Sequence, residues 1–268
     1  MDARTFDNFR KLIYEKSGIN LHEGKEAMVS ARVAKRMRTL NIAEHKEYFK
    51  HVINDHSGSE IVNLLDAIST NLTSFFRESD HFELLGELMG KWVSGGQRRF
   101  RLWSCACSSG EEPYSMAITS LEAVGIREVN CRVLATDLST QVLDKAREGI
   151  YESERVEKVQ KQVLARYFFK VASGNGRIQY QVKDEARRMV VFKRLNLSKP
   201  PFPMQGPLDV VFCRNVMIYF DNVVRVRLLE EITRLLKPRG YLFVGHAESL
   251  AGMLSSLKSV RPSVYVKD

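Results

Sequence analysis

Apolar residues in the first quarter of the chain recur at intervals of three and four, which is the spacing of an amphipathic helix. Ser17 and Gly18 end the first such stripe, in keeping with the preference for glycine just after a helix. No alternating strand pattern interrupts the four stripes, which lie within residues 6–14, 28–40, 48–52 and 61–68. The pattern predicts a small all-helical N-terminal domain over residues 1–76.

After residue 77 the pattern changes to short apolar runs that alternate with helical stretches. We expect strands at residues 100–103, 132–136, 189–195, 208–213, 240–245 and 260–266, and helices at 80–93, from 139, and at 221–236. The run LDVVFC (208–213) is almost wholly apolar, as a strand buried on both faces of a parallel sheet should be. The alternation predicts an α/β domain over residues 77–268 with a doubly wound, mostly parallel sheet.

Residues 150–190 fit this alternation less well. Residues 156–169 show helical spacing, Ser-Gly-Asn-Gly at 173–176 is a turn pattern, and RIQYQV at 177–182 alternates like a half-exposed strand. We expect a small antiparallel β-subdomain at about residues 169–187, inserted into the larger domain.

The turn after the first predicted strand carries the candidate binding chemistry. It consists of small residues from Ser104 to Gly110, which let a ligand approach the backbone and, at the glycine, allow unusual backbone angles. A strand, a tight turn and a helix in this order open the nucleotide-binding crevice of α/β domains. Either Ser108 or Ser109 is expected to cap the helix.

Glu111 and Glu112 occupy the first turn of this helix, where dinucleotide-binding folds place a pyrophosphate on free N–H groups. Two carboxylates there repel an anion and attract a cation. S-adenosylmethionine (SAM) meets that demand, because it is a nucleoside that carries an ammonium and a sulfonium group. The simpler alternative is that both glutamates only complement the helix dipole.

Other strand ends place polar residues at the same edge of the predicted sheet, where open α/β sheets bind ligands. Asp137 follows the strand at 132–136 and is placed either to accept hydrogen bonds from the ribose hydroxyls of a nucleoside or to cap the next helix. Arg214 and Asn215 follow the strand at 208–213. His246 follows the strand at 240–245, and we expect its role to be structural.

Composition is that of a globular protein with a formal net charge of +9, which favours an acidic partner. The four cysteines form no C-x-x-C pair and have no histidine at ligand spacing, so we expect free thiols and no metal. No apolar run approaches ~18 residues and the N-terminus lacks a signal peptide's apolar core, so we expect a cytoplasmic protein without membrane insertion. We also expect no appended repeat domain and a monomer.

The second predicted helix has no acidic residue between Ala27 and Asn41. Beside its apolar stripe it carries four basic side chains, namely Arg32, Lys35, Arg36 and Arg38. Such a basic face is either simply solvated or a docking surface for an acidic partner.

Six motifs are spread over nearly the whole chain: NLTSFFRE, WSCACSSGEEPYS, ATDLS, RLNL, FCRNVMIYFD and GHAESL. Together they resemble the motifs of the chemotaxis receptor glutamate methyltransferases, the CheR family. Cys105 is a mild departure, since alanine is more usual there. The resemblance implies methyl transfer from SAM, with S-adenosylhomocysteine as product, to glutamate side chains on the cytoplasmic helices of chemoreceptors, giving glutamyl methyl esters for sensory adaptation.

The resemblance also implies roles for individual residues. Arg77 and Tyr219 would lie nearest the transferred methyl group, Glu112 would bind the methionyl ammonium and Asp137 the ribose. The other implied cofactor contacts are Asn71, Thr73, Asn196, Leu197, Arg214 and Asn215. The basic helix would meet the methylated helix of the receptor, and the β-subdomain is similar to one that grips a receptor tail peptide in some members.

The implied chemistry needs little catalytic equipment. A glutamate carboxylate is ionised at pH 7, its reference pKa being about 4.3, so it attacks the sulfonium methyl group without a general base. The enzyme then supplies proximity, alignment and exclusion of water. In line with this, no Ser-His-Asp or Cys-His arrangement is readable in the sequence.

Three alternatives fit the residues less well. A nucleic-acid base methyltransferase would usually carry Asn/Asp-Pro-Pro-aromatic where this chain has Asn-Val-Met-Ile (215–218), and no aromatic-rich basic stripe is present for stacked bases, so we expect no nucleic acid. A SAM-binding sensor without activity would lack the reactive-centre residues, which are all present. A nicotinamide oxidoreductase is disfavoured by the two glutamates and by the missing G-x-G-x-x-G fingerprint.

Overall fold

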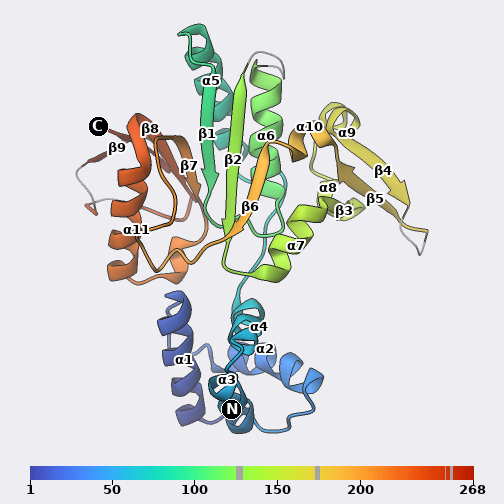
Figure 1. Ribbon diagram of the computed structural model, residues 1–268, viewed down its shortest axis with the longest axis vertical. Coiled ribbons are helices and arrows are strands. Elements are labelled where there is room, and N and C mark those ends of the chain that lie inside the picture. Colours follow the sequence, from blue (N-terminus) through green and yellow to red (C-terminus); the bar gives the residue numbers. More distant parts are fainter. Residues whose placement is uncertain (125–128, 173–175, 251, 254–255) are drawn as a thin grey trace.

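The computed structural model describes residues 1–124, 129–172, 176–250, 252–253 and 256–268 (Figure 1). Its N-terminal part contains only helices: α1 (Ala3–Ser17), α2 (Glu26–Thr39), α3 (His45–Asn54) and α4 (Ser59–Ile68). Their apolar stripes meet in one hydrophobic cluster around Phe9, Val33, Tyr48 and Leu64, which are fully buried. The predicted all-helical domain is therefore confirmed.

The larger part is built on a seven-stranded sheet in the order β6-β2-β1-β7-β8-β10-β9. Its strands are β1 (Arg99–Ser104), β2 (Asn130–Asp137), β6 (Val190–Arg194), β7 (Leu208–Cys213), β8 (Leu236–Val244), β9 (Leu257–Arg261) and β10 (Val264–Lys267). The first five strands in the order are mutually parallel, whereas β10 runs antiparallel to both β8 and β9. This agrees with the predicted mostly parallel sheet.

Helices cover both faces of this sheet (Figure 1). Side chains alternate along the strands, so that Leu102 joins the cluster under α5 (Ser79–Ser94) and α6 (Glu111–Val124), while Trp103 joins the cluster under α11 (Asn222–Leu235). The helix α7 (Thr140–Glu148) contacts β2 and β6. The carboxyl ends of β1, β2 and β7 point toward the N-terminal domain (Figure 1).

A second, three-stranded sheet projects from the side of the domain, in the order β3-β5-β4 (Figure 1). Its strands are β3 (Ile150–Glu152), β4 (Phe168–Ala172) and β5 (Ile178–Val182), with the short helices α8 (Ser153–Val156), α9 (Lys161–Tyr167) and α10 (Asp184–Arg187) beside them. Both pairings are antiparallel, as predicted. The turn predicted at 173–176 lies mostly outside the described residues.

Several predicted boundaries were wrong. The single helix expected at 156–169 is instead two short helices, α8 and α9, with the non-helical residues 157–160 between them, and α9 ends at Tyr167 because the buried Phe168 opens β4. β3 was not predicted, since it has only three residues. The strand expected at 240–245 begins at Leu236 and passes an irregularity near Pro238 and Arg239, and the single strand expected at 260–266 is the β9–β10 hairpin, which turns at Ser263 with φ of 60°.

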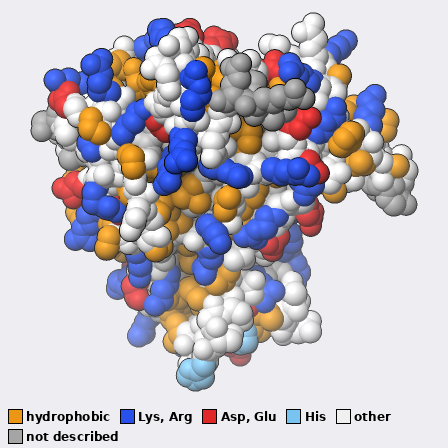
Figure 2. Space-filling model, turned by 45° about the horizontal axis from the view of Figure 1, so that its top comes forward, with side chains coloured by type: hydrophobic (Ala, Val, Ile, Leu, Met, Phe, Trp, Pro, Cys, Tyr) orange, Lys and Arg blue, Asp and Glu red, His pale blue; other side chains and the backbone are white. Residues whose placement is uncertain are grey.

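Among the described residues, no helix combines the length and the apolar character needed to cross a membrane. On the face shown in Figure 2, Lys and Arg side chains are spread widely, with fewer Asp and Glu side chains among them. The positive net charge is therefore distributed over the surface and is not gathered in one patch on this face.

Candidate cofactor site

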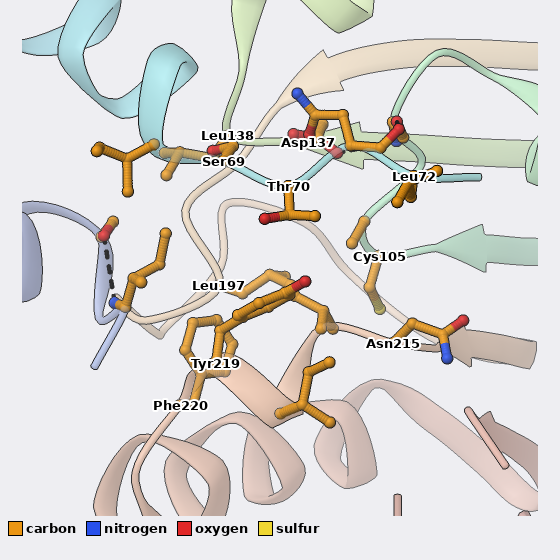
Figure 3. Close-up of a pocket in the computed structure, with 18 of the residues that line it drawn as sticks. Ser69, Thr70, Leu72, Cys105, Asp137, Leu138, Leu197, Asn215, Tyr219 and Phe220 are labelled. Atoms are coloured by element: carbon orange, nitrogen blue, oxygen red, sulfur yellow. Dashed lines mark hydrogen bonds between the residues drawn. The ribbon is translucent and has the colours of Figure 1, made fainter. Parts of the chain in front are cut away.

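A cleft of about 500 Å³ lies at the carboxyl ends of β1, β2 and β7 and is closed on one side by the N-terminal domain. That volume suits a nucleoside-sized ligand. Figure 3 shows Tyr219 and Leu197 on one side of it and Asp137, Leu138 and Thr70 across from them. Every predicted site residue lines it, namely Asn71, Thr73, Arg77, Glu112, Asp137, Asn196, Leu197, Arg214, Asn215 and Tyr219.

The turn after β1 contributes Cys105, Ala106 and Ser108 to the cleft, but not Gly110. Gly110 has a φ of 98°, and a Cβ there would lie 2.8 Å from the Tyr151 hydroxyl and 2.9 Å from the Ala146 Cβ. The glycine is therefore required for packing of the turn against neighbouring elements. The unusual backbone angles expected at Gly110 are confirmed, and the small residues before it are the ones that line the cleft.

The two glutamates that open α6 point in different directions. Glu112 lines the cleft, whereas Glu111 is fully buried away from it, accepts a hydrogen bond from the Ser109 hydroxyl at 2.7 Å and lies 3.4 Å from Arg155. The Ser108 hydroxyl donates to the Asn71 carbonyl at 3.1 Å. Both serine hydroxyls thus donate to oxygen atoms, and neither accepts a hydrogen bond from an N–H group of α6 among the described residues. Only one of the two glutamates faces the cleft.

Glu112 is held from two sides. The Ser104 hydroxyl donates to its Oε1 at 2.6 Å, and Nη1 of Arg214 lies 3.3 Å from its Oε2. Burial raises the pKa of Glu112 above its usual value, although the Arg214 charge and the Ser104 hydrogen bond act in the opposite direction. A cationic group in the cleft would offset this cost of burying the carboxylate.

Arg214 links two carboxylates beneath the cleft. Its Nη2 lies 3.0 Å from Oε2 of Glu78 and donates to the Arg77 carbonyl, and its guanidinium lies 5.4 Å from the ring centres of both Phe82 and Phe212. The side chain is only 1% exposed. A buried guanidinium with two carboxylates and two aromatic faces has one defined position.

Asp137 stands at the end of β2. Its carboxylate accepts backbone hydrogen bonds from Ser108 and Ser139, each at 2.9 Å. Burial raises the pKa of Asp137 despite these donors. Each carboxylate oxygen has a further lone pair, so the side chain can still accept from a diol in the cleft. The cap of α7 is instead Ser139, whose hydroxyl accepts from Val142.

Asn215 adopts a φ of 57°, which is uncommon outside glycine. The carboxylate of Glu248 holds it there, because it accepts from the backbone N–H groups of Asn215 and Gly245 at 2.7 Å and of Met217 at 2.8 Å. Glu248 thus positions the whole segment that carries Asn215 and Tyr219. Glu248 lies within the GHAESL motif, but no role for it could be read from the sequence.

The linker between the domains forms another wall of the cleft. Phe75 anchors it in the core, with its ring centre 4.9 Å from that of Tyr151 and 5.3 Å from that of Phe168. Arg77 donates to the Leu72 carbonyl at 3.1 Å, and its side chain is 41% exposed. The packing of Phe75 in the core therefore fixes the linker, which places Asn71, Thr73 and Arg77 along the cleft.

Sequence reasoning missed the contribution of the N-terminal domain to this cleft. Its lining residues from the segment after α1 and the first turn of α2 are Ile19, Asn20, Leu21, His22, Lys25 and Met28. The segment is tied to the larger domain, because Asn20 N–H donates to the Tyr219 carbonyl at 2.8 Å and the Asn196 amide donates to the Lys16 carbonyl at 2.7 Å. These pairs are far apart in sequence, and no motif signals them.

A mostly parallel sheet with a cleft at its carboxyl edge and two carboxylates facing that cleft fits a SAM-dependent methyltransferase, and the protein-family models that match the chain show that it is one. Residues 71–266 match the model described as "CheR methyltransferase, SAM binding domain", and residues 4–69 match "CheR methyltransferase, all-alpha domain". The chain belongs to the CheR methyltransferase family.

Curated relatives are similar along most of their length. Chemotaxis protein methyltransferase 2 of Pseudomonas aeruginosa is 40% identical over 97% of this chain and 91% of the relative. The chemotaxis protein methyltransferases of Escherichia coli K12 (40% identical, 92% of this chain, 84% of the relative) and Salmonella typhimurium (37%, 97% and 88%) match similarly. A solved SAM-dependent methyltransferase from Mesorhizobium loti is 18% identical with a TM-score of 0.33, over 55% of this chain and 46% of the other.

Proposed function

We propose that this protein transfers the methyl group of SAM to glutamate carboxylates on the cytoplasmic helices of methyl-accepting chemotaxis receptors, giving glutamyl methyl esters for sensory adaptation. The observation that carries the proposal is the direction of Glu112. Its carboxylate, only 14% exposed at a helix N-terminus, faces the cleft, where it suits a ligand ammonium. The names of the relatives, chemotaxis protein methyltransferases, support the receptor as the substrate.

In this proposal SAM supplies the electrophilic methyl group, and the chain's residues bind and orient it. Glu112 holds the methionyl ammonium, Asp137 the ribose, Asn196 and Leu197 the adenine side, and Asn71, Thr73, Arg214 and Asn215 complete the contacts. Arg77 and Tyr219, which line the cleft, would lie nearest the methyl group. The receptor carboxylate would attack this group in line, so that a carbon–oxygen bond would form as the carbon–sulfur bond breaks, with S-adenosylhomocysteine as the leaving group.

For the acceptor, exposed charge on α2 supports docking of an acidic receptor helix. Lys35 and Arg38 are exposed. Arg36 instead forms an ion pair with Glu60, and Arg32 donates to Thr70 at 3.0 Å and to the Ile68 carbonyl. We therefore assign direct docking to Lys35 and Arg38, while Arg32 and Arg36 keep the helix in place.

The three-stranded sheet supports a second contact with the receptor tail. β4 is an edge strand, so its outer N–H and C=O groups have no neighbouring strand among the described residues. Phe169 and Ile178 are 55% and 54% exposed on this subdomain. An extended peptide would add to β4 as a fourth strand.

Calorimetric titration with SAM and S-adenosylhomocysteine tests the site. We expect Glu112→Gln and Asp137→Ala each to weaken binding roughly 10-fold or more, because each removes a charged hydrogen-bonding partner. Glu111→Gln is the matched control, since Glu111 lies in the same helical turn but outside the cleft, and it should bind like the wild type. Wild-type binding by Glu112→Gln, or no binding by the wild type, contradicts the proposal.

Labelled SAM then tests the acceptor. We expect label in receptor fragments only when their glutamates are intact, and we expect alkali to release it as methanol, because carboxylate methyl esters hydrolyse in base. Label that resists alkali, or label in fragments whose candidate glutamates are replaced by alanine, would exclude glutamyl ester formation.

A further inference from the structure

Glu78, His81 and His246 form a cluster behind Arg214 that the proposed reaction does not use. One ligand atom from each of the three lies within 4.8 Å of the others. Glu78 and His81 come from the start of α5, and His246 follows β8. No metal was expected from the sequence, because the four cysteines lack ligand spacing, whereas His81 and His246 are far apart in sequence and meet only in the folded chain.

His81 has unsatisfied polar atoms at this point. It is 1% exposed, and neither ring nitrogen has a hydrogen-bond partner among the described residues. A buried imidazole without partners loses its interactions with water and gains none. Its Nδ1 lies 3.5 Å from Oε2 of Glu78. Two ligand atoms of one tetrahedral zinc ion, each ~2.1 Å from the metal, would be ~3.4 Å apart.

We propose that Glu78, His81 and His246 bind a divalent transition-metal ion of the zinc type, with water as the fourth ligand. Two imidazoles and a carboxylate are a known donor set for zinc. Oδ2 of Asp80 lies 3.2 Å from Nε2 of His246, within hydrogen-bond distance, and would orient that ring as metal-bound histidines require. The His246 side chain is 50% exposed and gives the ion a route from solvent.

The metal site would share an atom with the cofactor cleft. Oε2 of Glu78 is also the oxygen that lies 3.0 Å from Nη2 of Arg214. An ion that takes this oxygen competes with Arg214 and leaves its guanidinium to pair more closely with Glu112. This step rests on the proposed function, in which Glu112 binds the SAM ammonium. Because Arg214 would then compete for Glu112, the bound ion weakens SAM binding. The coupling is reciprocal, so SAM weakens metal binding by the same factor.

Titration of chelator-treated full-length protein with Co²⁺, followed by its visible absorption, tests the site. We expect one equivalent to bind, to give the spectrum of a four-coordinate ion and to be displaced by Zn²⁺. His246→Gln should lose at least about 10-fold in affinity and Asp80→Asn a similar factor. His56→Gln, an exposed histidine elsewhere, is the control. No saturable binding, or equal binding by His246→Gln, overturns the proposal.

Calorimetry of SAM with and without saturating Zn²⁺ tests the coupling separately. We expect weaker SAM binding with Zn²⁺ in the wild type and no effect in His246→Gln. Co²⁺ binding without any SAM binding would support the metal site and refute the proposed function. SAM binding without Co²⁺ binding would refute the metal site and leave the proposed function supported. Co²⁺ binding with SAM affinity unchanged by Zn²⁺ would overturn the link through Arg214.

Discussion

Arg214 shows how one residue connects the parts of this site. It follows β7, a fully buried strand, and reaches Glu78 before α5 and Glu112 in α6. Its charge lowers the pKa of Glu78 below the usual value, although burial acts in the opposite direction. Without Arg214 both carboxylates would lie close together with no compensating cation.

We predict that Arg214→Met destabilises the protein by about 3–5 kcal/mol, because it leaves buried carboxylates without their partner. Arg214→Lys should cost less, since it keeps the charge but cannot pair with both carboxylates at once. Urea unfolding of the three proteins at pH 7 measures the difference. Equal stability of Arg214→Met and the wild type would show that the ion pairs contribute nothing net.

The pKa of Glu112 predicts how SAM binding depends on pH. In the free protein burial raises this pKa above 4.5. The SAM ammonium stabilises the ionised carboxylate, so the pKa is lower in the complex. SAM affinity should therefore fall as the pH decreases toward the raised pKa and be constant near pH 7, where the ligand amine is still charged. Calorimetry between pH 4.5 and about 7 checks this, and Glu112→Gln should give a flatter profile.

At the scale of elements, the basic residues of α2 have two different roles, because Arg36 holds the helix in place whereas Lys35 and Arg38 are assigned to docking. Arg36 makes two hydrogen bonds to Glu60 of α4, at 2.6 and 2.8 Å, and the Tyr48 hydroxyl of α3 donates to the same carboxylate at 2.8 Å. Burial raises the pKa of Glu60, but the hydrogen bonds from Arg36 and Tyr48 outweigh it and hold the pKa below 4.5. The resulting stability is present at neutral pH and is lost as the pH falls through this lowered pKa.

We predict that Glu60→Ala lowers stability by about 1–3 kcal/mol at pH 7, with a smaller loss in strong acid.

Lys35→Glu with Arg38→Glu should instead leave stability and SAM affinity unchanged and reduce methylation of a receptor fragment. Thermal unfolding measures the stability of these variants, calorimetry measures their SAM affinity, and label transfer measures methylation of the receptor fragment. Unchanged methylation by the double variant would remove α2 from the docking surface.

Elements that are specified by neighbouring residues were predicted correctly, whereas features that depend on contacts between distant parts of the chain were not. Helices of the N-terminal domain and the buried strand β7 were predictable, because a local period or an apolar run specifies them. The break after Tyr167 was not, since Phe168 leaves the helix to pack on Phe75, which lies about ninety positions earlier. The spacing of apolar residues along the chain cannot predict such a long-range contact.

The candidate site divides in the same way. The motif residues that follow β1, β2, β6 and β7 share the carboxyl edge of the sheet, which topology alone predicts. Glu248 and the segment that holds Asn20 were not assigned, because they act through backbone groups of distant segments. Glu111 and Glu112 looked equivalent in sequence, and only the helix orientation separates them.

At the scale of the whole molecule, the cleft is complete only while the two domains are packed together. Gly18, with a φ of 74°, lies against Ser198 beside the cleft residues Asn196 and Leu197. The Tyr14 hydroxyl donates to Asp221 at 2.7 Å, and the Thr140 hydroxyl donates to Asp66 at 3.2 Å. Both α1 and α4 thus pack on the larger domain beside the cofactor cleft.

We predict that Gly18→Ala weakens SAM binding several-fold, because a Cβ there would lie 2.4 Å from the Ser198 Cβ and push the two domains apart. Gly58→Ala is the matched control, since its φ of 70° gives a similar backbone cost of about 1–2 kcal/mol but nothing lies within 4 Å of the added Cβ. Both variants should lose similar backbone stability, and only Gly18→Ala should lose SAM affinity in calorimetry. If the two bind SAM alike, the N-terminal domain does not shape the cleft, and its lining residues reach the ligand without controlling its affinity.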